Sequence, residues 1–377
     1  MKKHLIYAVV ILLVAGLTNC MAQTGDTAGS PLLNGGELFT ARDLKQTADI
    51  SGAIRISPVS GQDSTISKEG VYLLSGTYRD MTVIIDAGDD AKVQLVLENL
   101  KVTNTDSPAV YVKSADKVFV TTAAGSSSLQ VSGAYRSDGD TNLDSVIFSR
   151  SDITLNGTGS LEIVSAQGNG ISTKDDLKIT GGTLKVSALK DGLEANDSVR
   201  IYGGSLTINA RKDAVHAEND EDSSTGYIFI SGGNLNITAG DDGLQGTTIA
   251  QIDGGTIAIV QCMEGIEATH VQINGGKMAI NAQDDGINAA AKGDGSVILE
   301  VNGGEITVVM AEGDTDAFDA NGDLYIRGGT INVTARSAFD ADGTAQMTGG
   351  QVTVNGTVVT ELATQGFGHG GFGGRRR

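Results

Sequence analysis

The stretch DGLEANDSVRIYGGSLTINA, residues 191–210, decides the fold, and variants of it recur along most of the chain. It opens with an acidic residue and a glycine, and a Gly-Gly pair separates its two later alternating apolar runs. Such pairs stand at 181–182, 203–204, 232–233, 254–255, 275–276, 303–304, 328–329 and 349–350. A period of about 22 residues with insertions predicts a solenoid, and the period-two alternation predicts that strands build it.

Each repeat carries three apolar segments. In the quoted unit these are Leu193/Ala195, Val199/Ile201 and Leu206/Ile208. Three inward-facing columns imply three sheets around one core, with neighbouring coils about 4.8 Å apart. We therefore predict an all-β fold: a right-handed parallel β-helix solenoid of three sheets and about twelve or thirteen coils. The Gly pairs should turn the corners with positive φ.

The repeat pattern also predicts the domain boundaries. Residues 46–360 should form one β-helix domain, because a solenoid has no global core to outgrow. Residues 23–45 should form a linker and N-terminal cap, in which 31–45 cover the first coil and its unpaired strand edge. The Gly-rich, Arg-ended segment 361–377 is expected to be a disordered tail.

Residues 1–22 have the pattern of an export signal. A charged start precedes the apolar run Leu5–Leu17, which is short for a membrane span. Leu17-Thr18-Asn19-Cys20 resembles a bacterial lipobox, which predicts lipidation of Cys20 and a cell-surface or outer-membrane lipoprotein. Cleavage after Ala22, which would discard Cys20 and give a secreted protein, is the alternative.

Composition narrows the function classes. The net charge of −19 argues against nucleic acid, since phosphate binding needs a basic face. An acidic surface suits divalent cations or serves solubility alone. Only His216 and His270 lie in the solenoid, which disfavours zinc.

The chemistry is concentrated in two polar columns beside the third apolar segment. The residue before the Gly or Ala of each acidic phrase runs Asn169, Asp191, Asp213, Asp242, Glu264, Asp285, Asp316, Ser337. Three positions later the residues are Ser172, Glu194, His216, Gln245, Glu267, Asn288, Asp319 and Asp340. Stacking would bring like charges together, which a hard cation with oxygen ligands relieves. A solvated ladder in which Asp merely favours the turn is the alternative.

We accordingly predict Ca²⁺ as the cofactor. Its ligands should be a subset of Asp191, Glu194, Asp213, Asp241, Asp242, Glu264, Glu267, Asp284 and Asp285.

Two stretches resemble the signature of a bacterial family. They are ITLNGTGSL (153–161) and GNGISTKDDLKITGG (168–182), and the pattern continues in DGLEANDSV (191–199), GTY (76–78) and LVLENL (95–100). The chain resembles carbohydrate-binding domain-containing proteins, β-helical binders of cellulose and acidic sugars, over roughly residues 40–350. The resemblance implies a pectate-lyase-like parallel β-helix, bound calcium, an exported or surface location and affinity for polygalacturonate-like polymers. It assigns no individual ligand.

The residue types favour an acidic polymer over cellulose. Flat cellulose is gripped by aromatic rows, whereas this chain has no Trp and only 8 Tyr. Calcium could bridge sugar carboxylates to the protein's own. Lys190, Lys212 and Arg336 occupy one column beside the acidic turns and are candidate carbohydrate-binding residues, with simple charge balance as the alternative.

The sequence leaves three functions open. The preferred one is non-catalytic, calcium-dependent binding of acidic polysaccharide at the cell surface. A lyase acting by β-elimination would need a cation and a base, which Lys190, Arg211, Lys212 or Arg336 could supply. However, no unique constellation interrupts the repeat. A structural surface spacer or adhesin is the third possibility.

Overall fold

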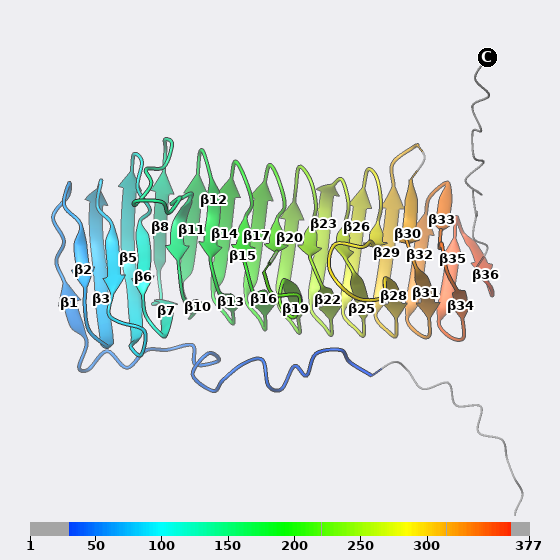
Figure 1. The fold of residues 1–377 in the computed structure, drawn as a ribbon, viewed down its shortest axis with the longest axis horizontal. Coiled ribbons are helices and arrows are strands. Elements are labelled where there is room, and N and C mark those ends of the chain that lie inside the picture. Colours follow the sequence, from blue (N-terminus) through cyan, green and yellow to red (C-terminus); the bar gives the residue numbers. More distant parts are fainter. Residues whose placement is uncertain (1–29, 220, 314, 363–377) are drawn as a thin grey trace, which may run out of the picture.

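The computed structural model describes residues 30–219, 221–313 and 315–362. The predicted signal segment with Cys20 and residues 363–377 of the predicted tail lie outside this part of the chain. The described residues wind into one elongated all-β solenoid (Figure 1). In these residues no helix has the length and apolarity that a membrane span requires.

Three parallel ladders run the length of the solenoid. The first contains β1 (Ile54–Ile56), β3 (Gly70–Arg79), β5 (Lys92–Asn104), β7 (Lys117–Thr122), β10 (Asp152–Gly157), β13 (Asp176–Ile179), β16 (Ser198–Ile201), β19 (Tyr227–Ile230), β22 (Ile249–Ile252), β25 (His270–Ile273), β28 (Ile298–Val301), β31 (Asp323–Ile326) and β34 (Ala345–Met347). The second continues from the long strands β3 and β5 through β8 (Ser126–Val131), β11 (Ser160–Ser165), β14 (Thr183–Ala188), β17 (Ser205–Ala210), β20 (Asn234–Thr238), β23 (Thr256–Cys262), β26 (Lys277–Ala282), β29 (Glu305–Met310), β32 (Thr330–Thr334) and β35 (Gln351–Val354).

The third ladder is a separate sheet of twelve strands. It contains β2 (Ser64–Ile66), β4 (Val83–Asp86), β6 (Val110–Ser114), β9 (Ser145–Ser149), β12 (Asn169–Thr173), β15 (Leu193–Ala195), β18 (Val215–Ala217), β21 (Leu244–Gly246), β24 (Ile266–Ala268), β27 (Ile287–Ala289), β30 (Asp316–Ala320) and β33 (Ser337–Phe339). At the C-terminal end, β36 (Thr357–Val359) folds back antiparallel onto β35. The predicted all-β parallel solenoid is thus confirmed, with one strand of the third ladder per coil.

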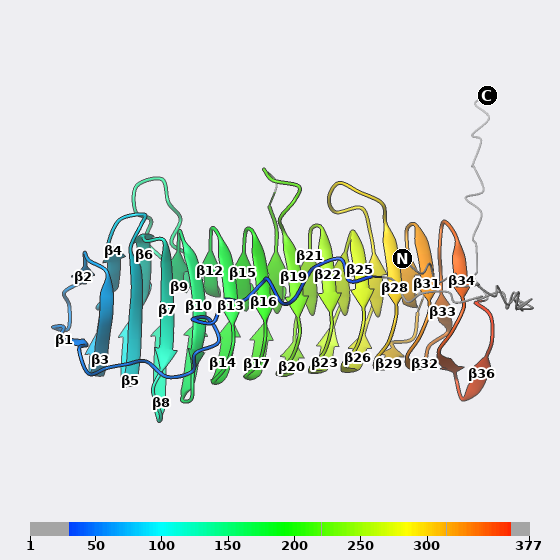
Figure 2. The same cartoon turned by 90° about the horizontal axis from the view of Figure 1, so that it is seen from below.

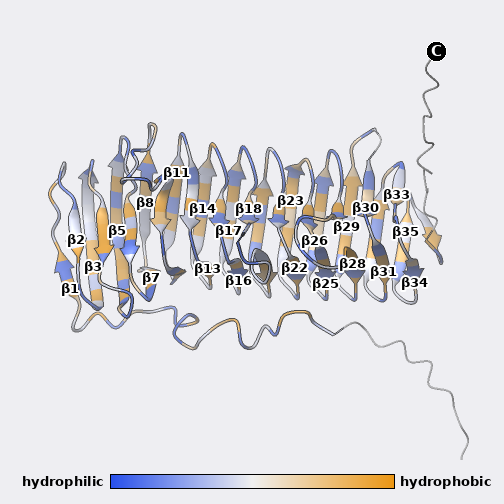
Figure 3. Ribbon diagram, viewed as in Figure 1, coloured by the Kyte–Doolittle hydropathy of each residue, from blue (hydrophilic) through white to orange (hydrophobic). Residues whose placement is uncertain are grey.

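The core consists of stacked columns, as the alternation predicts. Ile179 pairs with Ile201, and the same column continues to Ile273. All three side chains are fully buried. Figure 3 shows the resulting bands of apolar and polar residues at matching heights on neighbouring strands. Each coil therefore covers the apolar side chains of the next, and burial accumulates along the axis rather than around one centre.

The glycine corners have the predicted conformation. The second glycine of every pair from Gly182 to Gly350 has a positive φ, which is 103° at Gly204. A Cβ at Gly204 would also lie 3.0 Å from the carbonyl oxygen of Gly182 on the previous coil. The corner thus requires glycine for both conformation and close approach.

The prediction that residues 31–45 cover the N-terminal end is wrong. Residues 30–46, called the strap below, run lengthwise along the outer face of the first ladder (Figure 2). The amide of Gln251 both donates to the Leu33 carbonyl and accepts from the Leu33 N–H, at 3.1 and 2.6 Å. Near the other end of the strap, buried Asp43 accepts from Lys117 and from Thr154, each at 2.8 Å. Polar side chains on this face satisfy the strap's backbone, which explains why it lies here instead of over the end.

Candidate functional site

The two polar columns of the sequence lie along the third ladder. The turn column, Asn169 to Ser337, stands at or just before the strand starts, and the strand column, Ser172 to Asp340, lies within or just after the strands. The pairing places Ser172, Glu194, His216, Gln245, Glu267, Asn288 and Asp319 in one row of direct neighbours. Strand alternation turns the apolar neighbours of these residues into the core and leaves the polar columns on the outer face.

Acidic residues in the turn column also fasten one coil to the next. The Asp191 carboxylate accepts from the backbone N–H of Asp213 at 3.1 Å, and Asp213 accepts from that of Asp242 at 2.9 Å. Asp285 does the same for Asp316 at 3.1 Å. These bonds explain a repeated Asp without any ligand, but each uses only one carboxylate oxygen. The second oxygen of each residue remains available for other partners.

The carboxylates are buried, in contrast to the solvated-ladder alternative. Asp191, Asp213 and Asp242 are each only 4% exposed, and Glu267 is 3% exposed. Burial of an ionised carboxylate is costly unless a partner or a cation compensates it.

Three overlapping groups bring these side chains together. Asp242, Glu264 and Glu267 offer one oxygen each, and these oxygens lie within 4.8 Å of one another. This set is called the acidic triad below. The other groups are Asp213 with Asp241 and Asp242, and Asp191 with Asp213 and His216. Seven residues thus form one continuous row across neighbouring coils, six of which the sequence analysis had nominated as calcium ligands.

Crowding and burial shift the pKa values of the triad. Burial is the main cause that raises the pKa of Asp242 to about 8, and the negative charges of Asp213, Glu264 and Glu267 add to it. Burial also raises the pKa of Glu264 to about 7, helped by Glu267 and Asp285. The site therefore holds protons near neutral pH unless another cation replaces them.

Neutral and cationic groups complete the surroundings of the triad. Gln245 donates to Asp242 and to Glu267, each at 2.9 Å. The Lys292 ammonium lies 2.6 Å from Glu267. Asn288 donates from Nδ2 to Glu264 at 3.0 Å and to Glu267 at 3.4 Å.

The two hydrogen bonds that Asn288 donates use its amide nitrogen and do not involve its amide oxygen. Its side chain is only 6% exposed, and its Oδ1 atom has no hydrogen-bond partner among the described residues. A buried acceptor without a donor costs free energy, and this oxygen is free to accept a hydrogen bond or to ligate a cation. Sequence reasoning placed Asn288 in the strand column but did not nominate it as a ligand, and it missed Lys292 entirely.

At the other end of the row, His216 lies among three carboxylates, and its Nε2 atom is 3.5 Å from Glu218. Its Nδ1 atom lies 3.6 Å from Asp213 and 4.0 Å from Asp191, both longer than a hydrogen bond, and it has no hydrogen-bond partner among the described residues. Burial opposes its protonation, but the facing carboxylates outweigh burial and raise its pKa. When protonated, this imidazole offsets part of the charge of its carboxylate neighbours, as Lys292 does at the triad.

Three nominated ligands lie outside these groups. Glu194 accepts from Ser172 at 2.7 Å and from Asn169, which satisfies it locally. Asp284 is exposed, and Asp285 is engaged with the N–H of Asp316.

The nominated cations do not gather at one place. Lys190 lies 3.2 Å from Asp144, which supports simple charge balance for this residue. Lys212 is exposed near Asp191, whose pKa it helps to lower. Arg336 is exposed at the turn that precedes β33, several coils beyond the triad.

Comparison with known proteins places this molecule in a family. Residues 60–317 match the family described as carbohydrate-binding domain-containing protein, and the chain therefore belongs to it. A protein of the same description from Acetivibrio thermocellus is 34% identical over 188 residues, which make up 48% of this chain. The chain spans 64% of the length of that curated relative.

One solved structure shares the architecture. The polysaccharide lyase-like protein from C. thermocellum, solved as a gadolinium derivative, is 33% identical, with a TM-score of 0.50. The similarity covers 60% of this chain and 92% of that chain. These findings confirm the family resemblance noted in the sequence.

Proposed function

We propose that the protein binds an acidic polysaccharide without cleaving it, and that calcium held by the acidic triad bridges the polymer to the protein. The observation that carries this proposal is the buried Oδ1 of Asn288, which has no hydrogen-bond partner within the described part of the chain and lies beside three crowded carboxylates. Carboxylate and amide oxygens are the ligands that Ca²⁺ prefers.

The donor set fits a hard cation. Asp242, Glu264 and Glu267 would supply carboxylate oxygens, and Asn288 would supply its amide oxygen. Bound calcium would neutralise the triad and attract the carboxylates of an acidic polymer. The similar solved structure is a gadolinium derivative, and Gd³⁺ is likewise a hard cation that prefers oxygen. The family and the lyase-like fold support the saccharide part of the proposal.

Calorimetric titration tests the metal step. Calcium added to metal-free protein should bind and raise the melting temperature by mass action. Glu267→Gln should weaken calcium binding by about ten-fold or more, because it removes a charge from a buried ligand. The matched control is Glu305→Gln. Glu305 is an exposed glutamate at the start of β29 and is paired with Lys277 of β26. Equal calcium affinity in all three proteins would contradict the assignment.

Binding to polygalacturonate tests the function. Retention on the immobilised polymer should require calcium, fall with EGTA, and fall at acidic pH as both sets of carboxylates become protonated. Calcium binding without any retention of acidic polymers would favour the surface spacer instead.

Incubation with the same polymer tests the lyase alternative, which the polysaccharide lyase-like relative favours. We expect no unsaturated product that absorbs ultraviolet light. Its steady accumulation, lost on replacing Lys212, would overturn the non-catalytic function.

A further inference from the structure

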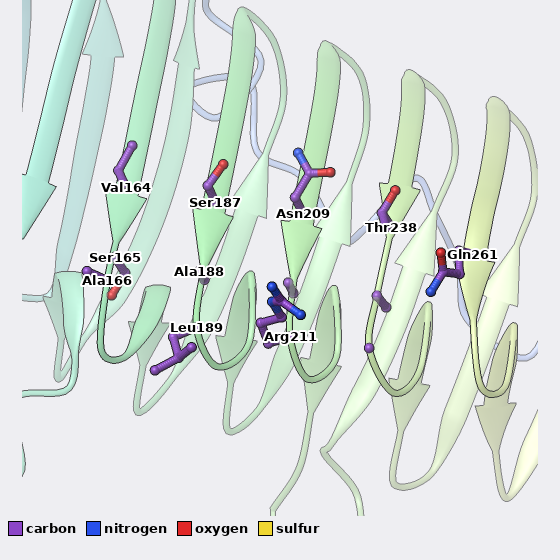
Figure 4. Close-up of a pocket in the computed structure, with 13 residues that line it drawn as sticks. Val164, Ser165, Ala166, Ser187, Ala188, Leu189, Asn209, Arg211, Thr238 and Gln261 are labelled. Atoms are coloured by element: carbon purple, nitrogen blue, oxygen red, sulfur yellow. The ribbon is translucent and has the colours of Figure 1, made fainter.

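A groove of about 500 Å³ runs along the rim between the second and third ladders. It crosses β11, β14, β17, β20 and β23, and its wall residues Ser187, Asn209, Thr238 and Gln261 stand on successive strands (Figure 4). Four strand spacings of about 4.8 Å give it a length of about 19 Å along the solenoid axis. One coil spacing is close to the length of one pyranose unit in a polysaccharide chain.

Small side chains make the rim hollow. Ala188, Ala210 and Ala239 line the groove at equivalent corners of three coils and are themselves buried. Gly240 continues this lining, and a Cβ there would lie only 2.2 Å from the carbonyl oxygen of Arg211. The backbone of neighbouring coils therefore approaches closely at this corner, and any larger residue would fill the groove or push the coils apart.

The lining offers what a sugar chain needs. Ser187, Asn209 and Thr238 form an in-register row of hydroxyl and amide groups that can bond to sugar hydroxyls. Leu189 presents an exposed apolar side chain at the same rim. The exposed Arg211 side chain has no ion pair or hydrogen bond with any residue that the structure describes, so its guanidinium is free to pair with a carboxylate.

The groove adjoins the acidic columns, and the repeat is broken at that point. Leu189 and Arg211 each precede a turn-column Asp by two residues. The strand register shifts in β23 between Ile259 and Cys262, immediately before Glu264 of the triad. Bulges of this kind re-aim side chains and are common beside functional sites. The metal-ligand row and the groove therefore share one rim.

We propose that one acidic polysaccharide chain lies lengthwise in this groove. Its hydroxyls face Ser187, Asn209 and Thr238, and its carboxylates face Arg211 on one coil and the calcium-bridged triad on others. This inference rests on the proposed function and specifies where the polymer lies. Coil spacing and sugar spacing then match well enough for several units to be bound in succession.

Substitution of Arg211 tests the groove with polygalacturonate as the probe, in the presence of calcium. Arg211→Ala should weaken binding about ten-fold, because one charge-assisted pair is lost, and Arg211→Lys should recover part of it. The matched control is Arg79→Ala. Arg79 is an exposed arginine at the end of β3. It begins the outward row of the second ladder that continues through Thr103 and Gln130 to Val164 and Ser187 of the groove. This control should bind as the wild type does.

A second measurement blocks the groove after folding. Asn209→Cys carries an exposed thiol, and maleimide labelling can be followed by mass spectrometry on the peptide that contains residue 209. Labelling should abolish retention on polygalacturonate, and bound polymer should protect the thiol. Binding and labelling that are independent of each other, together with wild-type affinity in Arg211→Ala, would overturn the groove while the calcium-dependent function stands. Failure of the wild type to bind polygalacturonate with calcium would overturn both.

Discussion

The calcium-free protein should lose stability as the pH rises from 5 to 7. The pKa of Asp242 is raised to about 8 in the folded chain, chiefly by burial and then by neighbouring carboxylates, whereas its ordinary value is 3.8. Between these two values the folded state holds a proton that the unfolded state has released. Stability is therefore greatest below the unfolded pKa and is lost as the pH rises through the folded one.

The magnitude follows from this difference. One proton held only by the folded state costs about 1.4 kcal/mol of unfolding free energy per pH unit, so Asp242 alone accounts for about 3 kcal/mol over two units. In a domain of this size that corresponds to roughly 5 °C in melting temperature. Glu264, with its pKa raised to about 7 by burial, acts in the same direction.

The assay is thermal unfolding in EGTA from pH 5 to pH 8, repeated with excess calcium. Asp242→Asn should flatten the pH profile, whereas Asp294→Asn, an exposed change in the loop before β28, should leave it as in the wild type. Calcium should stabilise more at pH 8 than at pH 5, because it replaces protons at the triad. A melting temperature that is constant or rises over this range in EGTA would refute the reasoning.

Three further changes test the core, the strap and the triad. Ile208→Asp places an unpaired charge in a fully buried column between Val186 and Ile237 and should lower the unfolding free energy by more than about 4 kcal/mol. The control Ile208→Val should cost about 1 kcal/mol. Similar melting temperatures for the two variants would contradict the register. Asp43→Ala should cost about 3 kcal/mol, because it removes the closer partner of the buried Lys117 ammonium and leaves it only Asp152, 3.7 Å away. A loss below about 1 kcal/mol by the same assay would mean that the strap is loosely held. Although burial opposes its ionisation, Lys117 and Thr40 lower the pKa of Asp43 to about 2, so its contribution should be lost only as the pH falls from about 4 through 2. Lys292→Gln removes the cation that competes at Glu267 and should tighten calcium binding several-fold in calorimetry; weaker binding would exclude the triad as the site.

Some features of the site could be predicted from the sequence. The acidic columns follow from period and register alone, because in a solenoid the residues at equivalent positions of successive repeats lie side by side on neighbouring coils. The burial of Asp191, Asp213 and Asp242 was not predictable, since the same Asp-Gly turn is compatible with full solvation. Lys292 lies in an insertion between coils, and no periodic signal connects it to Glu267.

By itself, the sequence determined the coil period, the three apolar columns, the glycine corners and the family. These depend on local backbone preference and on contacts repeated at a constant interval, so a single chain records them many times. Only the tertiary structure decided where the strap lies, which carboxylates share one cluster, and that the rim beside them is hollow. It also showed that the amide oxygen of Asn288 has no hydrogen-bond partner in the residues that the structure describes. These features depend on side chains that meet once, across coils or from segments more than 200 residues apart such as Leu33 and Gln251, and no repetition in the sequence marks such contacts.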